Sequence, residues 1–138
     1  ILNHGFKGYL FDGDETNINL AKDFFINKKD CSLYLPNLRN AWITKDNVND
    51  LLRQEGAIGE IDLFSLDMDG NDYWIWNALE AVQPKVVMIE VLNEFGMNDI
   101  VVPYDDNYVF PGKHPLYHSA SPVAMTKLAN TMISRLAY

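Results

Sequence analysis

The sequence predicts an α/β protein built on a doubly wound, mostly parallel sheet with helices on both faces. Short apolar runs alternate with segments of helical period about four times along the chain, as in a repeated strand–helix order. The run over 85–91 is apolar without alternation, so we expect helices to cover both of its faces. The 138 residues suit one domain, and a composition that is 48 % hydrophobic supplies a sizeable core.

The individual elements are predicted from apolar spacing, caps and breakers. Strands are expected at 8–12, 40–44, 61–67, 85–91 and 135–138. Helices are expected at 16–28, 45–56, 71–82 and 121–132. Thr44 could cap the second helix, and Ser121 followed by Pro122 is a typical start for the last one. Residues 94–120 combine prolines and aromatic residues without any period, which predicts a lid-like loop.

Composition excludes several classes of function. With 11 Lys and Arg against 19 Asp and Glu, the net charge is −8, which disfavours nucleic acid as a partner. Cys31 is the only cysteine, so the chain cannot form an internal disulfide, and we expect a reducing, cytoplasmic compartment. No apolar run approaches the length of a membrane-spanning helix, so we expect no membrane partner.

Polar side chains stand where the predicted strands end. Ligands of doubly wound sheets bind beyond the carboxyl ends of the strands, so these residues are candidates for a site. Strand-to-helix turns also favour Asp and Asn for turn and capping chemistry alone, which is the alternative interpretation. The candidates are Asp12, Thr44, Asp67, Asp69, Glu90 and Asn93.

One interpretation of these acids is phosphoryl transfer. The stretch "LFDGDET" resembles the D-x-D-x-T opening of haloacid-dehalogenase-like phosphatases. That resemblance implies that Asp12 attacks phosphorus, that Asp14 protonates the leaving oxygen, and that Mg²⁺ neutralises the charge. A second similar stretch, "LDMDGND", has Asn71 where the family has Thr, and a short D-x-D pattern is weakly specific.

A longer resemblance leads to a different interpretation. Residues 61–76, "IDLFSLDMDGNDYWIW", and 84–93, "PKVVMIEVLN", resemble the FkbM-type branch of S-adenosylmethionine-dependent methyltransferases. The stretch "YHSASPVAMTKLA" is similar to that family's Y-x-G-A-S-L segment, with Ser119 in place of the Gly and Pro122 in place of the Leu. Because this resemblance covers nearly the whole chain in order, we favour it over the phosphatase interpretation.

The resemblance implies how the cofactor, S-adenosylmethionine, would be held. Asp12, at the end of the family's second strand, would accept hydrogen bonds from both ribose hydroxyls, with Gly13 beside it. Thr44 follows the third strand and Asp67 the fourth, and both are expected to line the cofactor site. The family's fold is Rossmann-like.

The resemblance also implies catalytic and metal-binding roles. Asp67 and Asp69 would stabilise the sulfonium or act as the base for a hydroxyl on a small-molecule or sugar acceptor. Metal-dependent O-methyltransferases hold Mg²⁺ with acids at the ends of the fourth and fifth strands. Asp67, Asp69, Glu90 and Asn93 offer the oxygen ligands that such an ion prefers.

One family element has no counterpart in the sequence. The first strand and its glycine-rich turn would lie upstream of Gly5, so we expect 1–138 to be a single partial methyltransferase-like domain, a fragment with an incomplete sheet. A missing central strand would leave two exposed sheet edges, which predicts homo-oligomers formed through them. A non-catalytic Rossmann-like binding module is a further alternative.

Overall fold

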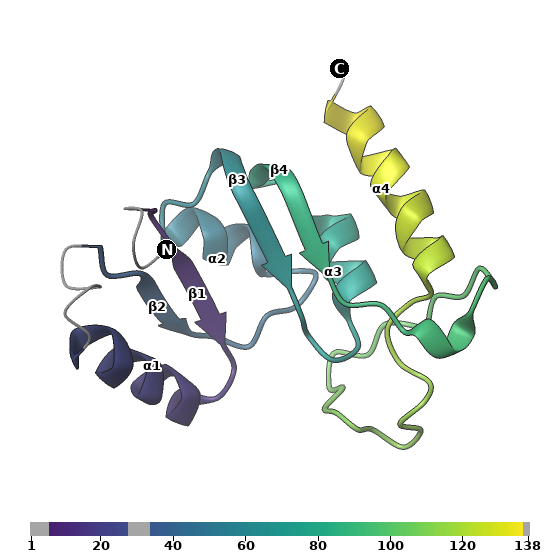
Figure 1. Ribbon diagram of the computed structural model, residues 1–138, viewed down its shortest axis with the longest axis horizontal. Coiled ribbons are helices and arrows are strands. Elements are labelled where there is room, and N and C mark those ends of the chain that lie inside the picture. The colour runs from purple at the N-terminus through teal and green to yellow at the C-terminus, as the bar shows by residue number, and fades with distance from the viewer. Residues whose placement is uncertain (1–5, 28–33, 137–138) are drawn as a thin grey trace. The chain divides into compact units, whose positions relative to one another are not determined.

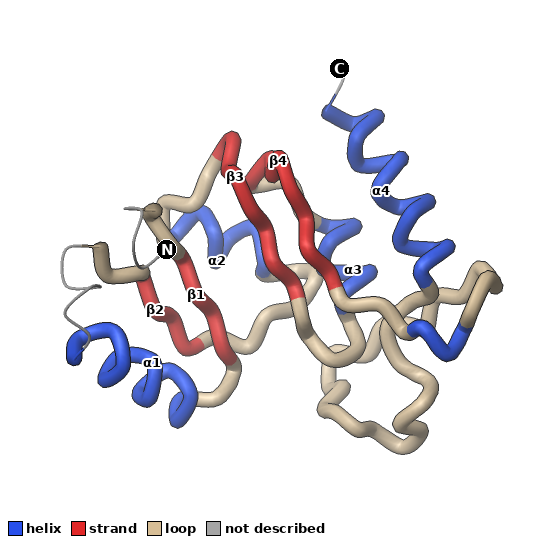
Figure 2. The backbone as a smooth tube through the Cα atoms, viewed as in Figure 1, coloured by secondary structure: helices blue, strands red, loops and turns tan. Residues whose placement is uncertain are grey.

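Parallel strand pairs, each joined through a helix, form the framework of the protein. The computed structural model describes residues 6–27 and 34–136, and Figures 1 and 2 show the elements. The chain divides into two compact units, Ile1–Ile43 and Thr44–Tyr138, each of which is described by itself. The strands form two sheets of two strands each, β1–β2 and β3–β4. The α/β class and the parallel pairing are therefore confirmed, while one continuous Rossmann-like sheet stays a prediction.

The first unit contains β1 (Tyr9–Asp12), α1 (Glu15–Asn27) and β2 (Asn37–Asn40). The two strands pair in parallel from Tyr9↔Asn37 to Asp12↔Asn40. The Asp14 carboxylate caps α1 by accepting a hydrogen bond of 2.7 Å from the backbone N–H of Thr16.

Helix α1 buries little of its hydrophobic surface. Ile18 is buried, whereas Leu20 is 63 % exposed and Phe24 is also exposed. Because β1 and β2 are four residues long each, their sheet offers little area for α1 to cover.

The second unit contains the longer elements. In chain order they are α2 (Val48–Gln54), β3 (Gly59–Leu66), α3 (Asp72–Ala78), β4 (Val82–Ile89), the 3₁₀ helix η2 (Asn93–Phe95) and α4 (Pro122–Leu136). Strands β3 and β4 pair in parallel from Gly59↔Val82 to Leu66↔Ile89. Buried side chains from the helices and the strand ends, among them Leu52, Leu66, Ile75, Trp76 and Leu128, form the core.

Side-chain hydrogen bonds fix the helix ends of this unit. The Asn49 amide joins α2 to the turn before β4, since its Oδ1 accepts from the N–H groups of Glu80 and Ala81. The Ser121 hydroxyl accepts from the N–H of Ala124 at 3.1 Å, which confirms the predicted start of α4. No helix among the described residues is both long and apolar enough to cross a membrane.

Several predicted element boundaries are wrong. The strand expected at 40–44 corresponds to β2, which already ends at Asn40. There the Asn40 side-chain amide and the Ala41 N–H both donate hydrogen bonds to the Asp12 carbonyl. Asn47, not Thr44, is the cap residue of α2, and its Oδ1 accepts from the Thr44 N–H at 2.7 Å. Helix α3 ends at Ala78, because β4 already begins four residues later.

The strand expected at 135–138 is also wrong where the structure describes it. Helix α4 continues to Leu136, and Arg135 in its last turn donates a hydrogen bond of 3.0 Å to the Asn77 carbonyl of α3. The remaining two residues of that expected strand lie outside the described residues.

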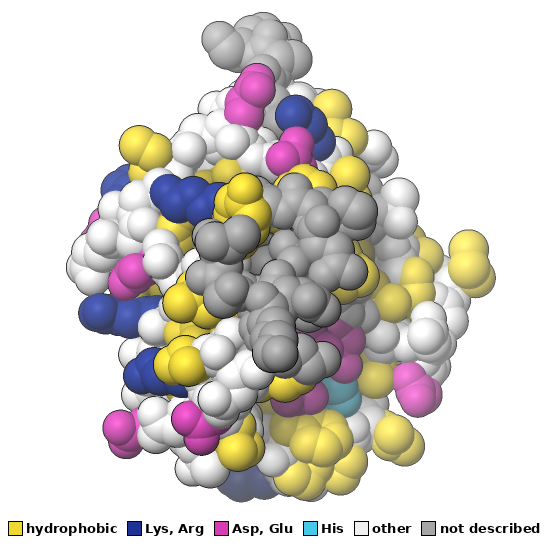
Figure 3. Space-filling view, turned by 60° about the vertical axis from the view of Figure 1, so that its left-hand side comes forward, with side chains coloured by type: hydrophobic (Ala, Val, Ile, Leu, Met, Phe, Trp, Pro, Cys, Tyr) yellow, Lys and Arg dark blue, Asp and Glu magenta, His cyan; other side chains and the backbone are white. Residues whose placement is uncertain are grey.

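The expectation that both faces of the strand at 85–91 are covered is wrong for one face. Leu63 pairs with Val86 in the register, so their side chains share a face of the sheet, and both are more than half exposed. Met88 on the same face is equally exposed, while Phe64 and Val87 on the other face are half-buried. Figure 3 shows one face of the molecule, on which hydrophobic side chains (yellow) reach the surface among acidic and basic ones.

Candidate functional site

Three of the predicted site residues come together at the carboxyl ends of β3 and β4. Asp67 directly follows β3, Asp69 lies two residues further on, and Glu90 directly follows β4. One oxygen from each carboxylate lies within 4.8 Å of the others. Figure 1 shows both arrowheads at the same end of the sheet, as parallel strands require. Asn93, the fourth residue expected there, begins η2 with an exposed side chain, for which no hydrogen bond is found among the described residues.

The turn that carries two of these acids is held by Asp72. This side chain is 0 % exposed. Its Oδ1 accepts from the N–H of Met68 at 2.9 Å, and its Oδ2 accepts from the N–H of Gly70 at 3.1 Å. Asp69 lies inside the turn in the left-handed region, at φ 58°. Asp72 is therefore a positioning residue, whereas its place in the sequence indicates only the start of the helix predicted at 71–82.

Negative charge accumulates at this site, because the charged groups that shift the pKa of Glu90 are all carboxylates of described residues. Burial raises the pKa of Glu90 to about 7, and the carboxylates of Asp72, Asp67 and Asp69 contribute to that rise. Burial also raises the pKa of Asp72, against the lowering effect of its hydrogen bonds from the backbone. The site therefore favours ligands that bring positive charge.

Replacing Glu90 with glutamine is expected to change how stability depends on pH. The folded protein retains the Glu90 proton between pH 4.5 and 7, where the unfolded chain loses it, so the free energy of unfolding falls as pH rises through that window. After allowance for solvent screening, this loss is on the order of 1 kcal/mol. Urea denaturation at pH 5 and pH 8 should show a smaller loss in Glu90→Gln than in the wild type. Glu80→Gln, at an exposed position, is the control, and equal losses in all three proteins would contradict the assignment.

A long loop is tied to the same turn. The Trp74 indole N–H donates to the Val102 carbonyl at 2.8 Å, and the Asn71 amide donates to the Asp105 carbonyl at 2.8 Å. At its other end, the Ser119 N–H donates to the Gly70 carbonyl at 3.0 Å. The prediction of a loop over 94–120 is confirmed apart from the end of η2 and an isolated bridge at Val101↔Ala120. This loop lies beyond the arrowheads of β3 and β4 in Figure 1.

Tyr108 in this loop covers the turn. A Cβ added to Gly70 would lie 2.5 Å from Cε1 of the Tyr108 ring, and one added to Gly112 would lie 2.8 Å from Cε2. The ring stacks on His118, with 6.3 Å between ring centres. Burial raises the pKa of Tyr108, and the charges of Asp69 and Glu90 raise it further. Tyr108 is thus part of the site, whereas the sequence indicated only that it lies in a lid-like loop rich in aromatic residues.

Ser119 shows a backbone conformation that favours glycine. Its φ is 57°, in the left-handed region, and its hydroxyl is buried without a hydrogen-bond partner among the described residues. In the methyltransferase segment that "YHSASPVAMTKLA" resembles, Gly stands at this position.

Replacing Ser119 with glycine is expected to raise the free energy of unfolding by up to about 1 kcal/mol, because it removes both the backbone strain and the unpaired hydroxyl. Ser121→Ala should lower it by about 1 kcal/mol, because that hydroxyl caps α4. Thermal denaturation of both variants measures the contrast. A Ser119→Gly protein as destabilised as Ser121→Ala would contradict the strain argument.

In the first unit, the predicted cofactor and phosphatase residues form the turn between β1 and α1. The Asp12 Oδ1 accepts from the N–H of Asp14 at 2.7 Å, and its Oδ2 accepts from the Asn17 amide at 3.1 Å. A Cβ on Gly13 would lie 2.7 Å from the Trp42 ring. Such bonds are what the alternative interpretation predicts, in which Asp12 serves only to stabilise the strand-to-helix turn. Each oxygen of the Asp12 carboxylate can still accept one further hydrogen bond. Of the other predicted cofactor residues, Thr44 and Asp67 belong to the second unit.

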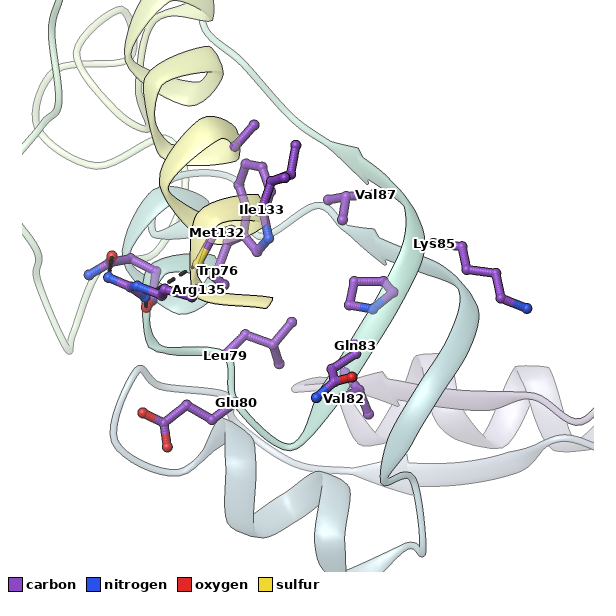
Figure 4. A pocket seen from close by; sticks show the side chains of 13 residues that line it. Trp76, Leu79, Glu80, Val82, Gln83, Lys85, Val87, Met132, Ile133 and Arg135 are labelled. Atoms are coloured by element: carbon purple, nitrogen blue, oxygen red, sulfur yellow. Dashed lines mark hydrogen bonds between the residues drawn. The ribbon is translucent and has the colours of Figure 1, made fainter. Parts of the chain in front are cut away.

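A separate groove of about 760 Å³ lies between β4, α3 and α4 (Figure 4). Its lining is mainly apolar, with Trp76, Leu79, Val87 and Met132 among the contributors. None of the predicted site residues lines it. The polar chemistry of the second unit is therefore at the carboxylate turn, outside this groove.

Comparison of the chain with known proteins leaves the family open. No protein-family model, no curated protein and no solved structure matches it. The function is therefore argued from the residues of the site.

Proposed function

We propose that the chain is a domain of an S-adenosylmethionine-dependent methyltransferase that methylates a hydroxyl group of a small molecule or sugar. The observation that supports this best is the meeting of Asp67, Asp69 and Glu90 at the carboxyl ends of two parallel strands. Ligands of α/β sheets bind at such strand ends. The left-handed Ser119, at the position of the family's Gly, adds support from the backbone.

The proposed roles follow the chemistry of the side chains. The bound cofactor supplies an electrophilic methyl group on a cationic sulfur. Asp67 or Asp69 would accept the proton that the acceptor hydroxyl releases. Alignment of the two groups and exclusion of water supply most of the acceleration, and Tyr108 covers the turn where this occurs.

Both expected bound groups fit the residues present. The Asp12 carboxylate retains acceptor capacity toward ribose hydroxyls, and we assign Asp12 and Gly13 of the first unit to the cofactor. Magnesium would be held by Asp67, Asp69 and Glu90, with Asn93 as a further oxygen donor. The buried Oε2 of Glu90, which lacks a partner among the described residues, suits a cation.

Calorimetric titration with S-adenosylmethionine and with S-adenosylhomocysteine tests the proposal. We expect saturable binding that Asp12→Asn weakens at least tenfold, because the amide replaces one of the two oxygens offered to the ribose. Asp23→Asn, at an exposed site on α1, is the control. A folded chain that binds neither compound would overturn the proposal.

The outcomes also separate the alternatives. Hydrolysis of 4-nitrophenyl phosphate with Mg²⁺, lost in Asp12→Asn, would support the phosphatase interpretation. Absence of that hydrolysis and of cofactor binding in a folded chain would support a non-catalytic binding module.

Self-association through the sheets is part of the same proposal. Each sheet has two strands, and β3 and β4 expose Leu63, Val86 and Met88 on one face. Exposed strand edges and apolar faces promote association. Light scattering at micromolar concentration should find a dimer or larger species, and a monodisperse monomer would contradict this part.

A further inference from the structure

Four buried polar atoms around Gly70 have no hydrogen-bond partner within the described residues. They are Oε2 of Glu90, the hydroxyl of Tyr108, Nδ1 of His118 and Oγ of Ser119. His118 is only 6 % exposed, and Ser119 is only 1 % exposed. Buried polar atoms are almost always paired, and leaving one unpaired costs about 1–3 kcal/mol. Four such atoms in one place indicate a missing polar ligand.

Contacts connect the four residues that carry these atoms to the same turn. The Tyr108 ring lies against Gly70, and the charges of Asp69 and Glu90 raise the pKa of its phenol. His118 stacks on that ring. Ser119 is hydrogen-bonded through its N–H to the Gly70 carbonyl, next to Asp69 in the chain. Glu90 belongs to the three-carboxylate group on the other side of the turn.

The chemistry of these atoms defines the ligand. A carboxylate oxygen, a phenol oxygen, a hydroxyl oxygen and the Nδ1 of an Nε2-protonated histidine all accept hydrogen bonds. Because all four atoms can accept a hydrogen bond, a ligand that brings hydrogen-bond donors as well as positive charge suits the site. The charged neighbours that shift Glu90 are all acids. Among the described basic residues, Lys45, Arg53, Lys85 and Lys127 form ion pairs outside the site, with Asp46, Asp50, Asp62 and Asp99 respectively.

A hydrated divalent cation meets both needs. The ion balances the carboxylates, and its water molecules are strong donors toward the remaining acceptors. Mg²⁺ keeps several of its waters when it binds proteins, whereas Ca²⁺ takes six to eight oxygen ligands with looser geometry. An anionic ligand would be repelled, and a neutral hydroxyl would leave the charge uncompensated.

We propose that Tyr108, His118 and Ser119 form an outer layer of a magnesium site, in which they accept hydrogen bonds from water molecules on an ion bound by Asp67, Asp69 and Glu90. These three are positioning residues, because they act on the ion through its waters. The inference rests on the metal site of the proposed function and is independent of methyl transfer.

Calorimetric titration of the chain with MgCl₂ alone, followed by CaCl₂, is the test. We expect saturable Mg²⁺ binding that is stronger than Ca²⁺ binding and is abolished by Asp69→Asn, since Asn tolerates the left-handed backbone at that position. Tyr108→Phe keeps the ring and removes only the hydroxyl. It should weaken Mg²⁺ binding tenfold or more, as loss of an outer partner does at other metal sites.

Two controls separate positioning from structural damage. Tyr117→Phe removes a hydroxyl from an exposed tyrosine of the same loop and should leave Mg²⁺ affinity unchanged. Metal-free Tyr108→Phe should keep the near-ultraviolet circular dichroism of the wild type and should lose part of the preference for Mg²⁺ over Ca²⁺. A merely structural hydroxyl would not alter that preference.

The inference fails if the folded wild type shows no saturable Mg²⁺ binding, or if Tyr108→Phe binds Mg²⁺ as well as Tyr117→Phe does. Its failure is distinguishable from that of the proposed function. Binding of S-adenosylmethionine without Mg²⁺ binding overturns the inference alone, and the reverse result overturns methyl transfer alone.

Discussion

Replacing Asp72 with alanine is expected to lower the free energy of unfolding by about 2–3 kcal/mol. The carboxylate accepts hydrogen bonds from the N–H groups of Met68 and Gly70, and both donors would lose their partner. Each unpaired buried donor costs about 1–3 kcal/mol. Removal of the buried carboxylate offsets part of this cost, because the free energy of burying that group is no longer required. Urea denaturation measures the change.

The control for this variant is another aspartate at the start of a helix. Asp50 is exposed and pairs with Arg53 three residues later at 3.0 Å. Asp50→Ala should therefore change stability by less than about 0.5 kcal/mol. Hydrogen exchange should quicken over 67–71 in Asp72→Ala and not in Asp50→Ala. Equal stabilities of the two variants would contradict the role given to Asp72.

Replacing Gly70 with alanine is expected to cost about 2–3 kcal/mol through overpacking. The added Cβ would lie 2.5, 2.7 and 3.1 Å from three carbons of the Tyr108 ring, which is itself stacked on His118. The ring must leave the turn, and amides over 106–117 should then exchange faster. Thermal or urea denaturation with hydrogen exchange measures both effects.

A double-mutant cycle isolates the contact. In a Tyr108→Ala background, the same Gly70→Ala change should cost less than about 0.5 kcal/mol, because the ring that it strikes is gone. A cost that stays at 2–3 kcal/mol in that background would show that the loss of stability arises from the backbone of Gly70 and not from contact with the Tyr108 ring.

The sequence predicted those features that depend on neighbouring residues. An apolar run with an acid at or near its end indicated the ends of β3 and β4 to within one or two residues. Asp67, Asp69 and Glu90 meet because parallel strands end at one edge. The start of α4 at Ser121–Pro122 was likewise a local signal.

Features that depend on distant contacts were missed. Nothing near Tyr108 indicates that its ring rests on Gly70, which lies far away in the chain. Asp72 had the features of a helix cap, and only the folded turn shows its carboxylate bound to Met68 and Gly70. The apolar run at 85–91 could not reveal that Val86 and Met88 are exposed, because exposure is set by what packs on the sheet.

The pairing of strands that are neighbours in the chain has a consequence for how the protein folds. Sheet β1–β2 closes within Tyr9–Asn40, and sheet β3–β4 closes within Gly59–Ile89. Each therefore needs only one contiguous segment and a modest loss of loop entropy. Either strand–helix–strand segment can therefore form its sheet without waiting for the other.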